Sequence, residues 1–111
     1  MTARREVICG PPGSGKSSYV NRHAVPGDLR WDLDDVAAVL GYGCTPSAVE
    51  TVKGSRLPRE LAALLVYLRD ALTTFLAEYR DLDLNVYVII SDELIAGVVA
   101  EEIGAEIVQC R

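Results

Sequence analysis

The sequence has few of the residues that form disulfide frameworks or metal centres. Its 111 residues include only three cysteines and one histidine, and no two cysteines are close together in the chain. A structural zinc site needs about four closely spaced Cys or His ligands, and a disulfide scaffold needs a dense, even set of cysteines. The composition therefore argues against both classes, and it favours a reducing compartment such as the cytoplasm.

Long apolar runs and an excess of basic residues are also missing. The longest apolar stretches, in 61–68 and 86–90, are too short to cross a bilayer, and the stretch after the N-terminal arginines is too short for a signal peptide. Eleven basic residues face 16 acidic ones, which gives a formal net charge of −5. We therefore expect no membrane partner and no broad nucleic-acid surface, although a small phosphate site remains compatible with this balance.

Glycine, in contrast, is concentrated in the stretch VICGPPGSGKSSYV, residues 7–20. Gly10, Gly15, Lys16 and Ser17 match the phosphate-loop pattern G-x-x-x-x-G-K-[ST], with a β-branched run before it and a helix-like run after it. Backbone N–H groups of such a loop, together with the start of a helix, attract an anion. A simple glycine turn would not need Lys followed by Ser. The predicted nucleotide-binding residues are Gly10, Pro11, Pro12, Gly13, Ser14, Gly15, Lys16, Ser17 and Ser18.

Within this loop, two side chains have predicted chemical roles. We expect the Lys16 ammonium to contact the β- and γ-phosphates of a nucleotide. The Ser17 hydroxyl is expected to bind Mg²⁺, a cation that prefers oxygen ligands. The loop therefore predicts ATP and Mg²⁺ as ligands.

The remaining pattern alternates between strands and helices. Strands are predicted at 5–10, 29–33, 84–91 and 105–110, and helices at 16–24, 34–40, 58–80 and 93–103, with a loop at 41–57. Alternation of this kind predicts an α/β fold in which helices flank a parallel sheet of about four strands in three layers. We expect one domain over residues 1–111.

Acidic residues follow two of the predicted strands. Capping of the next helix accounts for Asp32 and Asp35. Asp34 has no such local role, and it is a candidate catalytic base or Mg²⁺-organising carboxylate. Asp92 follows the third strand, where it could either help to hold Mg²⁺, directly or through water, or cap the next helix.

Three blocks of the sequence resemble a known family. GPPGSGKSSYV, DLDDV and VIISDELIAGVVAEEIGAEIV are similar, in order and spacing, to the kinase domain of bacteriophage polynucleotide kinase and to small phage-encoded P-loop ATP-binding proteins of the AAA type. The resemblance implies a P-loop NTPase fold of the nucleotide-kinase type, in a phage protein of the host cytoplasm. It also implies catalytic roles for Lys16 and Asp34, and Mg²⁺ binding by Ser17 and Asp92.

The chain departs from the polynucleotide kinases in two places. An arginine that follows the paired acids in those kinases corresponds to Ala37, and the sequence stops at Arg111, where their arginine-bearing lid begins. Phosphoryl transfer depends strongly on cationic charge near the phosphates. We therefore expect one of three situations: the lid lies on a removed segment, a partner supplies it, or the protein binds nucleotide without fast transfer.

Two functions are compatible with these features. The first is a P-loop kinase that moves the ATP γ-phosphate to a hydroxyl or phosphate acceptor, such as a nucleic-acid 5′ end, a nucleoside or a nucleotide. The alternative is an ATP-binding regulatory or assembly protein of phage type with slow or no turnover. The predicted helix 58–80 is apolar over much of its surface, which favours a homodimer.

Overall fold

The computed structural model describes residues 3–11, 13–32, 35–36 and 59–111. The chain divides into two compact units, and the first comprises Met1–Trp31 and Thr73–Arg111. The second unit is Asp32–Leu72, of which the structure describes only part. The helix α4 (Arg59–Glu78) contributes residues to both units. The predicted helix at 34–40, except for residues 35–36, and the predicted loop at 41–57 lie outside the described residues.

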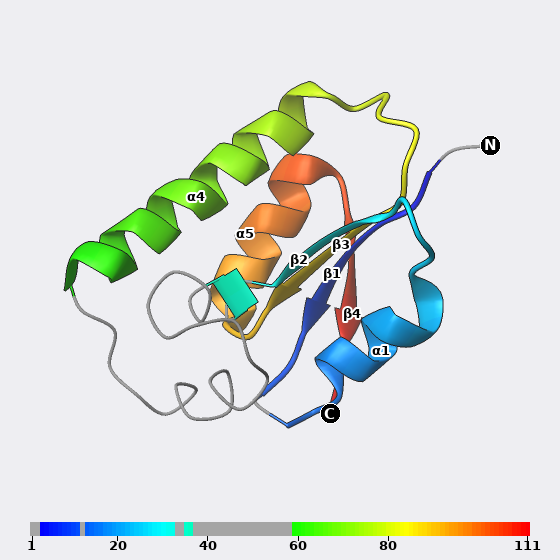
Figure 1. Cartoon of the computed structure of the whole chain (residues 1–111), viewed down its shortest axis with the longest axis horizontal. Helices are drawn as coiled ribbons and strands as arrows, with labels where there is room; N and C mark the ends of the chain where they lie inside the picture. The colour runs from blue at the N-terminus through cyan, green and yellow to red at the C-terminus, as the bar shows by residue number, and fades with distance from the viewer. Residues whose placement is uncertain (1–2, 12, 33–34, 37–58) are drawn as a thin grey trace. The chain divides into compact units, whose positions relative to one another are not determined.

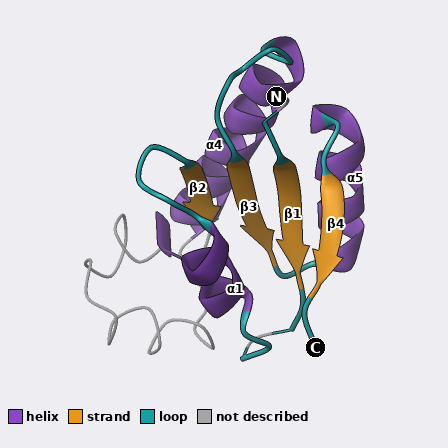
Figure 2. Ribbon diagram, turned by 90° about the vertical axis from the view of Figure 1, so that its right-hand side faces the viewer, coloured by secondary structure: helices purple, strands orange, loops and turns teal. Residues whose placement is uncertain are grey.

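Four parallel strands form the sheet, as Figure 2 shows. Its order is β2-β3-β1-β4, and the strands are β1 (Arg5–Cys9), β2 (Leu29–Asp32), β3 (Val86–Ile90) and β4 (Glu106–Gln109). The last residue of β1, Cys9, is level with Ile90 of β3 and with Gln109 of β4. The α/β class and the four-stranded parallel sheet predicted from the sequence are thereby confirmed.

One face of the sheet packs against the helix α1 (Lys16–His23). Ile8 of β1, together with Tyr87 and Ile89 of β3, forms a buried cluster with Val20 of this helix. Ile8 and Val20 are fully buried. Removing an aliphatic side chain of this size from water stabilises the fold by about 1.5–3 kcal/mol.

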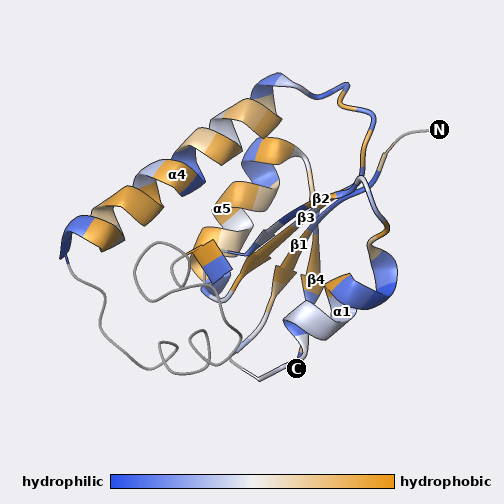
Figure 3. Cartoon of the chain, in the orientation of Figure 1, coloured by the Kyte–Doolittle hydropathy of each residue, from blue (hydrophilic) through white to orange (hydrophobic). Residues whose placement is uncertain are grey.

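The helix α5 (Glu93–Ile103) covers the other face, and Figure 1 shows α1 and α5 on opposite sides of the sheet. It buries Ala96, Val99, Ala100 and Ile103. Because both faces are covered, all five residues of β3 are buried, and the central strands are largely hydrophobic (Figure 3). This arrangement is compatible with the predicted three layers.

The strand order creates a switch point between β1 and β3. The connection that follows β1 passes through α1 to β2, whereas the connection that follows β3 passes through α5 to β4, at the other edge of the sheet. Right-handed crossovers in opposite directions place their helices on opposite faces. In open parallel sheets, ligands bind outside the carboxyl ends of strands at such a point.

Arg5, at the amino end of β1, forms hydrogen bonds with the ends of two helices. The Arg5 guanidinium donates to the carbonyl oxygens of Leu76 at 2.6 Å and Ile103 at 2.8 Å, and also to that of Tyr79. These oxygens lie at or just after the ends of α4 and α5, where backbone carbonyls lack partners within the helix. Arg5 therefore connects β1 to both helix ends.

The remaining element boundaries follow their sequence signals closely. α5 begins after Asp92 and ends just before Gly104, whose φ of 68° is left-handed, as expected for a helix-ending glycine.

Exposed apolar side chains on α4 include Tyr67 and Phe75. Dimerisation through this helix stays a prediction. Within the described part of the chain, no helix combines the length and apolar character needed to cross a membrane.

Candidate phosphate-binding loop

The predicted phosphate loop connects the end of β1 to the start of α1. Gly13 and Gly15 adopt left-handed φ values of 80° and 89°, which residues with a side chain rarely take. A hydrogen bond of 3.1 Å from the Ser14 N–H to the Pro11 carbonyl closes a turn. Pro12, another predicted nucleotide-binding residue, lies outside the described residues. The glycines are therefore needed for the backbone path into α1.

Gly10 is required for a different reason, namely close packing. A Cβ atom on Gly10 would lie 2.5 Å from the Cys110 carbonyl oxygen and 2.6 Å from the Ser14 hydroxyl oxygen. The Cys110 N–H also donates to the Cys9 carbonyl at 2.7 Å. The end of β4 thus lies directly against the start of the loop.

The N-terminus of α1 has neither a side-chain cap nor a carboxylate in its first turn. Gly15 precedes the helix and gives no side-chain cap, and the first turn has no acidic residue. The first N–H groups of a helix lack partners within the helix and carry partial positive charge. α5 differs, because the Asp92 carboxylate caps it and Glu93 lies in its first turn. Of these two helix starts, only that of α1 is free of carboxylates.

Lys16 is the most buried polar residue of the loop, with 8% of its surface exposed. Its Nζ atom donates to the carbonyl oxygens of Gly10 at 2.7 Å and Pro11 at 2.8 Å. These contacts satisfy an ammonium group that would otherwise be costly to bury. The Lys16 ammonium group therefore lies against the first residues of the loop.

The serine hydroxyls of the loop have different surroundings. Ser17 and Ser18 are exposed on the first turn of α1. The Ser14 Oγ atom, in contrast, is buried and has no hydrogen-bond partner. Within the ranges that the structure describes, no three His, Cys, Asp or Glu side chains gather as a metal site. Mg²⁺ binding by Ser17 stays a prediction.

Asp92 has a clear structural role. Its Oδ1 atom accepts from the N–H groups of Leu94 at 2.9 Å and Ile95 at 3.2 Å, so that it caps α5. This is the capping role that the sequence left open beside Mg²⁺ binding. Because Asp92 follows β3, the neighbour of β1, it lies at the same end of the sheet as the loop. Its Mg²⁺ role stays a prediction.

The Cys9 thiol, at the end of β1, is influenced by charged groups at the starts of both α1 and α5. Burial raises the pKa of the Cys9 thiol, and the Glu93 carboxylate raises it further, while the Lys16 ammonium lowers it. Cys9 is therefore a neutral thiol near neutral pH. Charges at the start of α1 and at the start of α5 both act on it.

The structure describes two of the other three predicted acidic residues, Asp32 and Asp35. Asp34, the candidate base, lies outside the described residues. Asp32 is half-buried at the end of β2, and Asp35 is exposed. The structure therefore brings the loop and Asp92 to one sheet edge, and the catalytic role of Asp34 stays a prediction.

Sequence reasoning missed the contribution of β4 to this edge. Cys110 packs against Gly10, and the exposed Arg111 follows it. A signal was available, since the predicted parallel strand 105–110 must end at the same edge as the strand before the loop. What the sequence did not reveal is that these two strands are neighbours.

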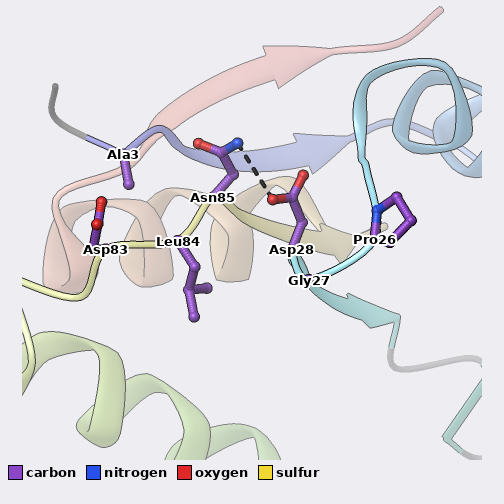
Figure 4. Close-up of a pocket in the computed structure, with 7 residues that line it drawn as sticks. All are labelled: Ala3, Pro26, Gly27, Asp28, Asp83, Leu84 and Asn85. Atoms are coloured by element: carbon purple, nitrogen blue, oxygen red, sulfur yellow. Dashed lines mark hydrogen bonds between the residues drawn. The ribbon is translucent and has the colours of Figure 1, made fainter.

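Two hollows lie at the opposite end of the sheet, near the amino ends of the strands. One, of about 360 Å³, is shown in Figure 4 and is lined by Ala3, Pro26, Gly27, Asp28, Asp83, Leu84 and Asn85. Asp28 accepts from the Asn85 amide at 3.4 Å and from the Val25 N–H at 2.9 Å. The Arg4 N–H donates to the Asn85 side-chain oxygen at 2.9 Å. These bonds fix the turn before β2, and we assign the hollow a structural role.

Comparison with known proteins gives no independent assignment. No protein-family model matches the chain, and no curated protein is significantly similar to it.

Proposed function

We propose that the loop between β1 and α1 binds the phosphates of ATP, and that the protein transfers the γ-phosphoryl group to a hydroxyl or phosphate acceptor. The observation that carries this proposal is the buried ammonium of Lys16 inside a glycine-rich turn at an uncapped helix start. A loop that merely joined a strand to a helix would not need a buried ammonium group, because burying a charge is costly unless the charge is paired and hydrogen-bonded.

Each group of the loop has a role toward a polyphosphate. The first N–H groups of α1 would donate to phosphate oxygens, and the Lys16 ammonium would hold the β- and γ-phosphates. The Ser17 hydroxyl would be a ligand of Mg²⁺. When bound, this ion neutralises charge on the phosphate oxygens.

The transfer step uses the same groups. An acceptor oxygen forms a bond to the γ-phosphorus as the bond to the β–γ bridging oxygen breaks, and ADP leaves. With a hydroxyl acceptor, a carboxylate takes the released proton, and Asp34 is the sequence-based candidate. The switch point between β1 and β3 favours an acceptor crevice beside the loop.

ATP binding is tested by calorimetric titration with ATP and Mg²⁺. The comparison is between Lys16→Ala and Arg22→Ala, because Arg22 is an exposed cation at the far end of the same helix. We expect Lys16→Ala to weaken binding at least about 10-fold, the loss of roughly one charge-assisted hydrogen bond. Arg22→Ala should bind like the natural chain. Equal affinities in both variants would contradict the proposal.

Phosphoryl transfer is tested with γ-labelled ATP and a panel of 5′-hydroxyl oligonucleotides, nucleosides and nucleotides. Label that moves to one of these acceptors supports the kinase. Label that stays on ATP despite tight binding supports the regulatory or assembly protein instead. In that case, sedimentation with and without ATP and Mg²⁺ should reveal a change in assembly.

A further inference from the structure

The strand β4 forms one edge of the sheet. Its neighbour on one side is β1, and no strand among the described residues pairs with its other side (Figure 2). Three of its four residues, Glu106, Ile107 and Gln109, are exposed. β4 contains neither lysine nor proline, which in many proteins prevent an edge strand from pairing with another chain. The outer side of β4 can therefore accept a further strand.

The pairing of β4 with β1 shows which of its backbone groups point outward. The Cys110 N–H donates to the Cys9 carbonyl oxygen of β1 at 2.7 Å, so the backbone of Cys110 is directed inward. Successive residues of a strand direct their N–H and carbonyl groups to opposite sides. The backbone groups of Ile107 and Gln109 therefore point away from β1, and a strand that pairs with this edge would bond to these two residues.

An apolar side chain lies in the middle of this edge. Ile107 is 51% exposed. It is level with Val7 of β1, the neighbour of Ile8, whose side chain packs toward α1. Because side chains alternate along a strand, Val7 and Ile107 lie on the opposite face, which α5 covers. A strand added beside β4 would shield Ile107 from water.

The helix α5 runs beside β4 on this face, in the opposite direction. Near the end of β4, the Gln109 side chain donates to the Glu93 carboxylate in the first turn of α5 at 3.2 Å. Gly97 and Glu101 follow Glu93 at intervals of four residues, and residues at this spacing are neighbours on a helix surface. Exposed Glu101 therefore lies near the amino end of β4.

The exposed charges at the two ends of β4 differ in sign. Glu101 and Glu106 are at the amino end, and the exposed cation Arg111 follows the carboxyl end. The acids at the carboxyl end already have partners, since Asp92 caps α5 and Glu93 accepts from Gln109. A strand that runs antiparallel to β4 and carries the same charges would therefore bring opposite charges together.

We propose that β4 pairs with β4 of a second copy of this chain, antiparallel, about a twofold axis at Val108. In this register, Ile107 of one copy lies opposite Gln109 of the other, and their outward backbone groups exchange hydrogen bonds. Arg111 of each copy lies opposite Ala105 of the other, near its Glu101. The two four-stranded sheets then form one continuous sheet. This pairing requires no nucleotide and does not depend on the proposed function.

Sedimentation equilibrium of the nucleotide-free chain tests the backbone pairing. Gln109→Pro removes an N–H that points to solvent in the single chain, a position at which edge strands tolerate proline. The natural chain should be a dimer at micromolar concentration. Gln109→Pro should weaken it at least about 10-fold, because two hydrogen bonds are lost per dimer. Gln109→Ala is the control, since it loses the same bond to Glu93 but keeps the N–H, and it should stay dimeric.

A natural chain that remains monomeric would overturn the proposal, and so would equal dissociation constants for Gln109→Pro and Gln109→Ala. Circular dichroism confirms that each variant folds.

A charge exchange tests the antiparallel register. Arg111→Glu and Glu101→Arg should each weaken the dimer about 5-fold or more, because like charges then face each other at two places per dimer. The double variant again has opposite charges at both places and should regain the affinity of the natural chain. A double variant that binds no better than either single variant would overturn the register.

A change on α4 separates this dimer from one formed through that helix. Tyr67 is 71% exposed on α4, so Tyr67→Lys should leave pairing through β4 unchanged. A dimer that is lost in Tyr67→Lys and kept in Gln109→Pro would overturn the proposal, and it would support the association through α4 that the sequence predicts.

Discussion

The backbone of Cys110 occupies the space that a side chain on Gly10 would need, since a Cβ atom there would lie 2.5 Å from the Cys110 carbonyl oxygen. Real Cβ atoms do not approach backbone that closely, so Gly10→Ala must push the loop and the end of β4 apart. Changes of this kind cost about 1–3 kcal/mol of stability. We expect Gly10→Ala to lower the free energy of unfolding by that amount in a urea titration.

A second glycine gives the matched control. Gly97 lies within α5, and a Cβ atom there would meet nothing within 4 Å. Gly97→Ala should therefore stabilise the protein, by up to about 1 kcal/mol, through the better helix propensity of alanine. If both variants changed stability alike, close packing at Gly10 would not be the cause.

Asp92 allows its capping and metal roles to be separated. Asp92→Ala removes the acceptor for the N–H groups of Leu94 and Ile95, and should cost about 1 kcal/mol of stability. Asp92→Asn keeps a good capping oxygen and should cost little. If Asp92 also helps to hold Mg²⁺, Asp92→Asn should weaken ATP binding in the presence of Mg²⁺ without lowering the melting temperature. Unchanged binding in Asp92→Asn would leave Asp92 with capping alone.

Arg5 should contribute more to stability than its neighbour Arg4. Arg5→Ala leaves the carbonyl oxygens of Leu76 and Ile103 without their charged donor, and we expect a loss of about 3 kcal/mol. Arg4 is exposed, and its hydrogen bond to Asn85 is donated by its backbone N–H, which Arg4→Ala retains. Urea titrations of the two variants give the comparison. Similar losses of stability in Arg5→Ala and Arg4→Ala would indicate that the change in net charge, and not the loss of the Arg5 hydrogen bonds, is the cause.

Stability should fall in alkaline solution because of a partly buried tyrosine. Burial and the hydrogen bond to the Glu6 carboxylate raise the pKa of Tyr19. A pKa that is higher in the folded state gives a contribution that is fully present below the unfolded value of about 10 and lost as pH rises through the folded value. The free energy of unfolding should therefore decrease above about pH 10.

Tyr19→Phe tests this origin directly. Phenylalanine has no ionisable group, so the variant should show a smaller decrease in stability over the same pH range. Burial also raises the pKa of Tyr87, with further contributions from Asp28 and Glu6, so that some decrease should remain. An identical pH dependence in Tyr19→Phe and the natural chain would show that Tyr19 does not cause it.

Elements of the fold with strong local signals were predicted well. The apolar run around Val86–Ile90 indicated a strand, and the helix predicted at 93–103 has the same bounds as α5. The phosphate-loop pattern likewise predicted a glycine-dependent turn before Lys16, and left-handed Gly13 and Gly15 are found there. These signals work because they depend on the conformational preferences of a few consecutive residues.

Contacts between distant parts of the chain were not predicted in the same way. The sequence predicted a role for Lys16 in phosphate binding, but it gave no sign that Gly10 and Pro11 would accept hydrogen bonds from Lys16. Nor did it indicate that Arg5 would bind the carbonyl at the end of α5. Each of these bonds uses a backbone carbonyl, a group that every residue has, and a sequence pattern therefore does not identify the acceptor.

For this protein, the sequence alone determined the succession of the described strands and helices and the position of a glycine-rich loop with the phosphate-loop pattern, because hydrophobic periodicity and turn preferences act over short distances. Only the tertiary structure decided that β1 lies between β3 and β4, and hence that the loop, Asp92 and Cys110 meet at one edge of the sheet. Strand neighbours are selected by how the covered faces pack together, and that selection involves residues about 80 to 100 positions apart in the chain.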